Sequence, residues 1–187
     1  MRVIVGGIGY RNLRDHSIGV AVAEHLALRS LPDDVSCEDL SFGPIAVLQR
    51  LEDEPPERRF ERAILVSGVA REGRLPATVA CYRWDAVLPS DEDIQRAVTD
   101  AVTGIIFLDN TAIVTRYFGG LPADVVIVEI EPLVHEFGES YSAPIAAIFD
   151  DVCDLVAALA TDPAAVVRLP VAPLGGGAGT RTRAEAW

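Results

Sequence analysis

Basic residues are scarce in this chain of 187 residues. It has 16 lysine and arginine residues against 28 aspartate and glutamate residues, which gives a formal net charge of −12. A surface that binds nucleic acid needs clustered basic side chains to neutralise phosphates. The charge therefore argues against nucleic acid as a partner.

Long apolar stretches are also missing from the sequence. No segment reaches the roughly 18 uninterrupted apolar residues of a membrane span, and the start "MRVIVGG" is too short before its glycines for a signal peptide. The three cysteines lie far apart in apolar runs, at Cys37, Cys81 and Cys153. We therefore expect a cytoplasmic protein with no membrane segment, no disulfide framework and no Cys-based zinc site.

Strand and helix patterns alternate along the chain, half of whose residues are hydrophobic. Short β-branched runs bounded by turn residues predict strands at 2–7, 35–40, 62–69, 77–84 and 124–131. Apolar residues at helical spacing predict helices at 17–29, 44–51, 91–102, 109–118 and 143–159. This order predicts a three-layer α/β/α sandwich around a mostly parallel sheet of roughly five strands. The alternating strand at 77–84 could pair antiparallel at a sheet edge.

The pattern ends near residue 160. We expect residues 1–160 to form one α/β domain, and residues 161–187, rich in Pro, Gly and Ala, to form a flexible tail that cannot bury enough surface to offset its ordering entropy. We therefore expect deletion of everything after about Ala172 to leave the fold intact.

Two glycines follow the first strand, in "VIVGGIGYRNLRDHSIGV". Gly7 and Gly9 match the start of the dinucleotide-binding fingerprint, but Asn12 stands at its third glycine, and no Gly-Lys-Ser/Thr sequence follows to form a P-loop. Glycines that permit a close strand-to-helix corner are the alternative. Ser67 lacks the Gly-x-Ser-x-Gly elbow of serine hydrolases.

The whole frame "GIGYRNLRDHSIG", residues 7–19, resembles the N-terminal motif of the [NiFe]-hydrogenase maturation proteases. The resemblance continues in order through "VSCEDLSFGP", "RAILVSGVAREGRLPATVACYRW", "NTAIVTRYFGGLPADVVIVEIEP" and "SAPIAAIFDDVCDLVAAL", and covers roughly residues 1–159. It implies a protein that binds a hydrogenase large-subunit precursor and removes a short C-terminal peptide. It also implies that nickel is presented by this substrate, so we expect no tightly bound cofactor.

The maturation proteases contact the metal through a Glu, an Asp and a His, and the resemblance implies that this chain has other residues at the three matching positions. His16 stands at the Glu position, Ser67 at the Asp position, and Asp109 or Asn110 at the His position. His16 and Asp109 would still offer one nitrogen and one anionic oxygen to a divalent metal, whereas the neutral Ser67 hydroxyl is a poor ligand. We therefore take His16 and Asp109 as the candidate metal ligands.

Other polar residues are candidates for the crevice at the carboxyl ends of the strands. Asp15 could orient His16, or it could cap the following helix. Asp39 is an acid retained at a strand end, or a hydrogen-bonding loop residue. Asp109 and Asn110 are also explained by helix capping. Glu129 and Glu131 share one strand face, so either could line the same crevice, or both could simply lie at an exposed strand end.

Two hypotheses about function follow from these positions. The first is an endopeptidase that acts on a nickel-loaded precursor in the crevice of His16, Asp39, Ser67 and Asp109. The second is a catalytically inactive homologue that keeps the fold and serves as an assembly or checkpoint scaffold. Replacement of the ligands favours the second, and retention of a polar crevice keeps the first open. The sequence leaves the peptidase activity, the metal, the partner and the oligomeric state undecided.

Overall fold

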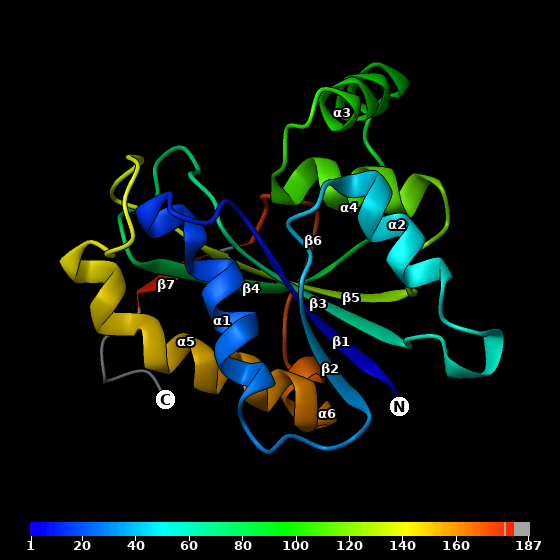
Figure 1. Ribbon diagram of the computed structural model, residues 1–187, viewed down its shortest axis with the longest axis horizontal. Helices are drawn as coiled ribbons and strands as arrows, with labels where there is room; N and C mark the ends of the chain where they lie inside the picture. The colour runs from blue at the N-terminus through cyan, green and yellow to red at the C-terminus, as the bar shows by residue number, and fades with distance from the viewer. Residues whose placement is uncertain (178, 182–187) are drawn as a thin grey trace.

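One twisted sheet separates two layers of helices in the computed structural model, which describes residues 1–177 and 179–181 (Figure 1). The strands are β1 (Val3–Ile8), β2 (Val35–Asp39), β3 (Arg62–Gly68), β4 (Thr78–Trp84), β5 (Asp124–Ile130), β6 (Val171–Ala172) and β7 (Gly179–Arg181). Six of them follow the order β2-β1-β3-β5-β4-β6, and β7 pairs with β4. The pairs among β2, β1, β3 and β5 are parallel, whereas β4 runs antiparallel to β5.

The helices cover both faces of this sheet. They are α1 (Ile18–Ala27), α2 (Pro44–Glu52), α3 (Asp91–Val102), α4 (Leu108–Tyr117), α5 (Ala143–Thr161) and α6 (Pro163–Val167), with short 3-10 turns at Arg14–Ser17 and Pro56–Arg58. One core cluster joins the sheet to α1, α5 and α6, and the other joins it to α2 and α4. Helix α3 packs on α4 and stands apart from the rest of the molecule (Figure 1).

The alternation of side chains along each strand explains the two cores. In β1, Val3 and Val5 belong to the α1 and α5 side, whereas Ile4 belongs to the α2 and α4 side, and all three are buried. Because successive strand residues point to opposite faces, a strand covered on both sides must be apolar throughout. The predicted α/β/α class and mostly parallel sheet are confirmed, as is the antiparallel pairing of the strand at 77–84.

The number of strands differs from the expected five. The two additional strands, β6 and β7, are short and come from the segment after residue 160, where the sequence predicts no regular structure. Both pair with β4, at Arg83–Trp84 and at Thr78–Ala80 respectively. Their short length and the surrounding Pro and Gly residues leave no periodic signal in the sequence, because pairing to β4 and not local propensity defines them.

Membrane association through a spanning helix finds no support in the described part of the chain, where no helix combines the length and apolarity that a bilayer crossing requires.

Residues 173–177 contact the body of the protein, so we now expect deletion of everything after Ala172 to lower the stability of the fold. Gly175 donates its backbone N–H to the Tyr82 hydroxyl at 2.9 Å, Arg74 donates to the Gly177 carbonyl at 2.8 Å, and Leu174 packs against the core. We expect this deletion to remove about 3 kcal/mol of stability, which lowers the melting temperature by about 6–12 °C. Thermal unfolding followed by circular dichroism measures the change.

Deletion of residues 182–187 alone is the matched control for this truncation, since it removes none of the described contacts. We expect it to melt like the full chain. Equal melting temperatures for the full chain and the chain ending at Ala172 would show that these contacts do not stabilise the fold.

Candidate functional site

Glycines form the corner between β1 and α1 because no side chain fits there. A Cβ atom on Gly7 would lie 2.3 Å from the Gly19 carbonyl oxygen, and one on Gly19 would lie 2.2 Å from the Val66 carbonyl oxygen. A Cβ atom on Gly9 would lie 2.3 Å from the carbonyl oxygen of His16. These glycines therefore let α1 and the turn approach β1 and β3 closely. Close packing explains the glycines, and they need no phosphate site to account for them.

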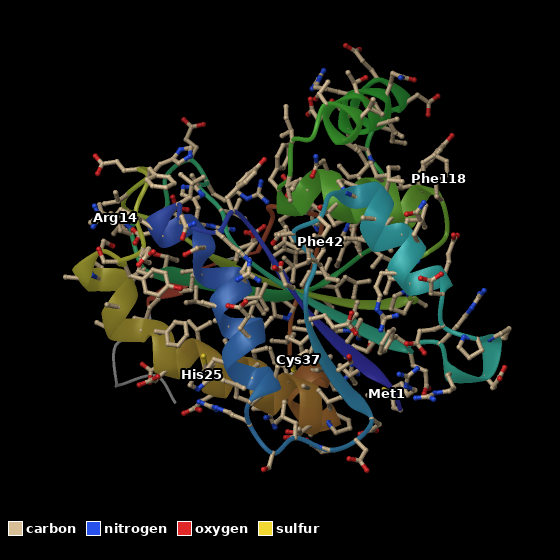
Figure 2. The ribbon with its side chains drawn as sticks, viewed as in Figure 1. Met1, Arg14, His25, Cys37, Phe42 and Phe118 are labelled. Carbon is tan, nitrogen blue, oxygen red and sulfur yellow. The ribbon has the colours of Figure 1, made fainter. Side chains whose placement is uncertain are left out.

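The loop from residue 9 to residue 17 is paired with the loop that follows β5. Arg14 joins the two loops by donating two hydrogen bonds. Its backbone N–H donates to the Gly138 carbonyl at 3.0 Å, and its Nε donates to the Ser140 carbonyl at 2.9 Å. Figure 2 shows Arg14 at the end of the molecule where α1 begins. Asn12 and Arg14 have φ angles of 61° and 43°, an uncommon conformation that such pairing maintains.

Asp15 holds these two loops together from a fully buried position. Its carboxylate accepts hydrogen bonds from the backbone N–H groups of Leu133 (2.9 Å), Val134 (2.9 Å) and Ser142 (2.7 Å) and from the Ser142 hydroxyl (2.7 Å). Burial raises the pKa of Asp15, but these hydrogen bonds outweigh it, so the pKa lies below the usual value. Asp15 thus anchors the loop after β5, because these four hydrogen bonds go to that loop and not to its own helix or to His16.

His16 faces a second histidine that this anchored loop supplies. The ring centroids of His16 and His135 are 4.4 Å apart and the rings are tilted by 44°. Burial lowers the pKa of His16, and the proximity of His135 lowers it further, so the His16 ring is neutral at pH 7. Two imidazoles at this distance form a pair that could contact a metal ion together.

A second polar cluster lies at the carboxyl ends of β3 and β5. Glu129 is fully buried and accepts hydrogen bonds from Arg71 Nη2 at 2.7 Å, from Arg74 Nη1, and from the Tyr82 hydroxyl at 2.9 Å. Arg71 also binds both carboxylate oxygens of Asp109, at 2.7 and 2.6 Å. Two guanidinium groups are thus balanced by two carboxylates, an arrangement that makes buried charge tolerable.

These charges shift one another's ionisation. Burial alone would raise the pKa of Glu129, but the hydrogen bonds and charges of Arg71 and Arg74 outweigh it and lower that pKa. Glu131 differs, because burial raises its pKa although its carboxylate accepts the Arg71 backbone N–H at 2.8 Å. Both carboxylates of "EIEP" are buried and contact Arg71, Glu129 through the guanidinium and Glu131 through the backbone N–H.

The remaining candidate residues have other surroundings. Asp39 accepts hydrogen bonds from Arg11 Nη2 at 2.7 Å and from the Ser41 backbone N–H at 2.9 Å. Ser67 is buried within β3, between β1 and β5. Asn110 is buried in the first turn of α4, where its side chain accepts the Phe107 N–H at 3.1 Å and donates to the Ile105 carbonyl at 2.7 Å. Asn110 therefore stabilises the start of α4.

The two candidate metal ligands belong to different clusters. His16 pairs with His135, whereas Asp109 has both oxygens bound to Arg71. Within residues 1–177 and 179–181, no three His, Cys, Asp or Glu side chains are arranged to hold a metal ion. A protein site for nickel or zinc ordinarily uses three or more protein ligands, so this donor set does not fit a resident metal.

Most of these contacts come from four residues that no sequence pattern predicts as part of a site: Arg71, Arg74, Tyr82 and His135. Arg71 and Arg74 lie in a charged loop, and Tyr82 lies in a strand, where an aromatic residue has an ordinary packing role. The one available signal was Glu129, a carboxylate inside the apolar strand "DVVIVEIE", because a buried carboxylate requires a cation nearby.

Comparison with known proteins was made by sequence and by structure. No sequence family and no curated protein matches the chain. The hydrogenase-maturating endopeptidase HybD from Escherichia coli superposes with a TM-score of 0.62 at 21% identity, over 83% of this chain and 90% of that one. A hydrogenase 2 maturation peptidase from a Thaumarchaeota archaeon superposes with a TM-score of 0.57 at 26% identity, over 83% and 95% of the two chains.

The protein has the fold of the [NiFe] hydrogenase maturation proteases. A third such protease, HybD from Thermococcus kodakarensis, superposes with a TM-score of 0.59 at 14% identity, over 86% of this chain and all of that one. The predicted resemblance to the maturation proteases is confirmed in the fold, and it supports a peptidase-like architecture. Because these sequence identities are low, the fold does not establish the activity, which has to be inferred from the residues of the site.

The hydrogen bonds to Asp15 predict a pH-dependent contribution to stability. A folded-state pKa below the unfolded value of about 3.9 contributes stability that is complete above that value and is lost as the pH falls through the folded pKa. We expect Asp15→Asn to lower the free energy of unfolding by about 2–3 kcal/mol at pH 7, and by less at pH 3. Urea unfolding of wild type and variant at both pH values measures the difference.

Asp33→Asn, at an exposed position, serves as the control and should unfold like wild type at both pH values. A deficit of Asp15→Asn that stays constant between pH 7 and pH 3 would contradict the assigned ionisation.

The buried ion cluster predicts a larger effect for Glu129. In Glu129→Gln, Arg71 and Arg74 lose their shared anion, so we expect a loss of about 3–5 kcal/mol in the free energy of unfolding. Tyr82→Phe removes the hydroxyl that donates to this carboxylate and accepts the Gly175 N–H, and it leaves both arginine pairs intact, so it should cost about 2 kcal/mol. Chemical denaturation of the two variants tests this order, and an unaltered stability for Glu129→Gln would refute the proposed dependence on its charge.

Proposed function

We propose that this protein binds the C-terminal region of a [NiFe]-hydrogenase large-subunit precursor in the cytoplasm and serves as an assembly or checkpoint factor that does not cleave it. The fold supports the part of this proposal that concerns hydrogenase maturation. The observation that carries the non-cleaving role is the occupied carboxylate of Asp109, since both of its oxygens are bound by Arg71.

The chemistry of the crevice supports this role. A maturation protease of the kind implied by the resemblance contacts nickel that its substrate carries, through two carboxylates and an imidazole. Here an imidazole replaces one carboxylate at His16, a buried hydroxyl replaces the other at Ser67, and the nearby Asp109 is neutralised by an arginine. Such a crevice would attract a nickel-bearing segment less strongly, because its anionic ligands are gone.

The pair of His16 and His135 favours a second candidate function, a rearranged metallopeptidase. The two imidazoles could contact a substrate-borne nickel ion while the substrate supplies the other ligands. In this alternative the histidine pair replaces the carboxylates of the maturation proteases, and peptide cleavage is retained.

A nickel-loaded large-subunit precursor distinguishes the two functions. We expect the purified protein to form a complex with it, detected by size-exclusion chromatography with light scattering. We also expect the mass of the precursor, measured by intact mass spectrometry, to stay unchanged. Loss of a C-terminal peptide would overturn the non-cleaving role, and absence of a complex would overturn the proposed partner.

Metal titration is the companion measurement. Isothermal titration of the free protein with nickel and with zinc should reveal no site tighter than about 1 μM, because at most two strong ligands converge. The variants His16→Ala, His135→Ala and Asp109→Ala locate any binding that does occur, and His25→Ala, on a different part of the surface, is the control. A tight site lost in His16→Ala and His135→Ala but kept in His25→Ala would favour the metallopeptidase.

A further inference from the structure

A cavity of about 470 Å³ is lined in part by Asp109, whereas Arg71, His16 and His135 are not among its lining residues. Its walls come from the loop after β4, the inner face of α3, the first turns of α4, and residues 173–174 of the C-terminal segment. The volume is within the range of about 300–1,000 Å³ that is typical of ligand sites. Figure 1 shows that α3, which forms one wall, is attached to the body of the protein through α4.

The larger part of the cavity wall is apolar. Val87 and Leu88 come from the loop after β4, Phe107 and Ile113 from the region of α4, and Leu174 from the C-terminal segment. Val87 and Phe107 keep 67% and 41% of their surface exposed, so apolar surface remains for a ligand to cover. Burying such surface favours binding in proportion to the area removed from water.

The charges of the cavity are predominantly negative. Among the described residues that line it, the one cation is Arg96, which is paired with Asp93 at 3.0 Å and with Glu92 at 3.6 Å. Asp85 also lines the cavity, and its carboxylate accepts the Val87 backbone N–H at 3.0 Å.

Asp100 is the second carboxylate of the cavity without a cation. Among residues 1–177 and 179–181, neither Asp85 nor Asp100 forms a salt bridge. The cavity thus combines an apolar wall with two carboxylates that have no positive partner. A ligand that satisfies both features carries a cation on an apolar body, because an anion would be repelled and a purely apolar ligand would leave the carboxylates unpaired.

We propose that this cavity binds a peptide segment of a partner protein in which an arginine side chain lies next to apolar residues. The guanidinium would face Asp85 and Asp100, and the apolar neighbours would cover Val87, Leu88 and Leu174. The net charge of −12 favours the approach of such a basic segment and disfavours acidic ones. The proposal goes beyond the proposed function, since it does not require that the partner be a hydrogenase precursor.

Two short synthetic peptides test the chemistry of the occupant. One is a fluorescein-labelled, C-terminally amidated Gly-Leu-Arg-Val-Gly, and the other has Gln in place of Arg. We expect fluorescence anisotropy to show binding of the arginine peptide that weakens as salt is raised, and at least tenfold weaker binding of the glutamine peptide. Equal binding of the two peptides, or no binding of either, overturns the proposal.

Variants of the cavity locate the binding. The double variant Asp85→Asn/Asp100→Asn should weaken the arginine peptide at least about fivefold, whereas Asp33→Asn/Asp53→Asn, which removes the same charge elsewhere, should weaken it less than twofold. Asn at position 85 keeps an oxygen that can accept the Val87 N–H, so the loop is preserved. Circular dichroism confirms that both variants are folded. Equal affinities for the two double variants would show that overall charge, and not this cavity, attracts the peptide.

Two further experiments test the contribution of the apolar wall and the location of the bound peptide. Val87→Ser, at an exposed position, should weaken the arginine peptide about threefold without loss of folding. Amide chemical-shift changes on peptide addition should cluster at residues 85–89 and 93–100. Shifts confined to the crevice of His16 and His135, or a chain that dimerises through α3 and excludes the peptide, would overturn the proposal. Failure of the precursor to bind, with the peptide still bound, would overturn only the proposed function.

Discussion

The neutralisation of Glu129 is the constraint on which the candidate site depends. A carboxylate buried near the end of an apolar strand is tolerated only with cations beside it, and Glu129 has two, Arg71 and Arg74. The chain contains no lysine, so every cation available for this purpose is an arginine, whose planar fork can bind two carboxylates at once. Arg71 does so, and through it β5, the loop after β3 and the start of α4 become one unit.

This arginine pairing also changes what the crevice can do. In the fold of the maturation proteases, the carboxyl ends of the parallel strands are where ligands are expected. Here that region is divided into two parts, a histidine pair on one side and a neutralised carboxylate cluster on the other. A carboxylate that is already paired with an arginine has little to offer a metal ion, so stability is a better explanation of the cluster than metal binding.

The loops around the crevice are held by charge as well. Asp15 uses its carboxylate to bind the loop after β5, and this brings His135 to His16. Arg74 and Tyr82 similarly hold the C-terminal segment at Gly175 and Gly177, and the same segment forms one wall of the cavity beside α3. Buried carboxylates thus define both the crevice and the neighbouring cavity, although neither Asp15 nor Glu129 is exposed to a ligand.

The sequence by itself determined the layered architecture, because strands such as "RAILVSGV" are buried on both faces and therefore carry an uninterrupted apolar run, here from Ala63 to Val66. It also indicated the glycine corner, where residue size alone decides what fits. The tertiary structure decided the partners of Asp15, Asp109 and Glu129, which lie 118, 38 and 58 positions from groups that they bind. It likewise decided the short strands β6 and β7, since hydrogen bonds to β4 define them and no local pattern encodes such distant contacts.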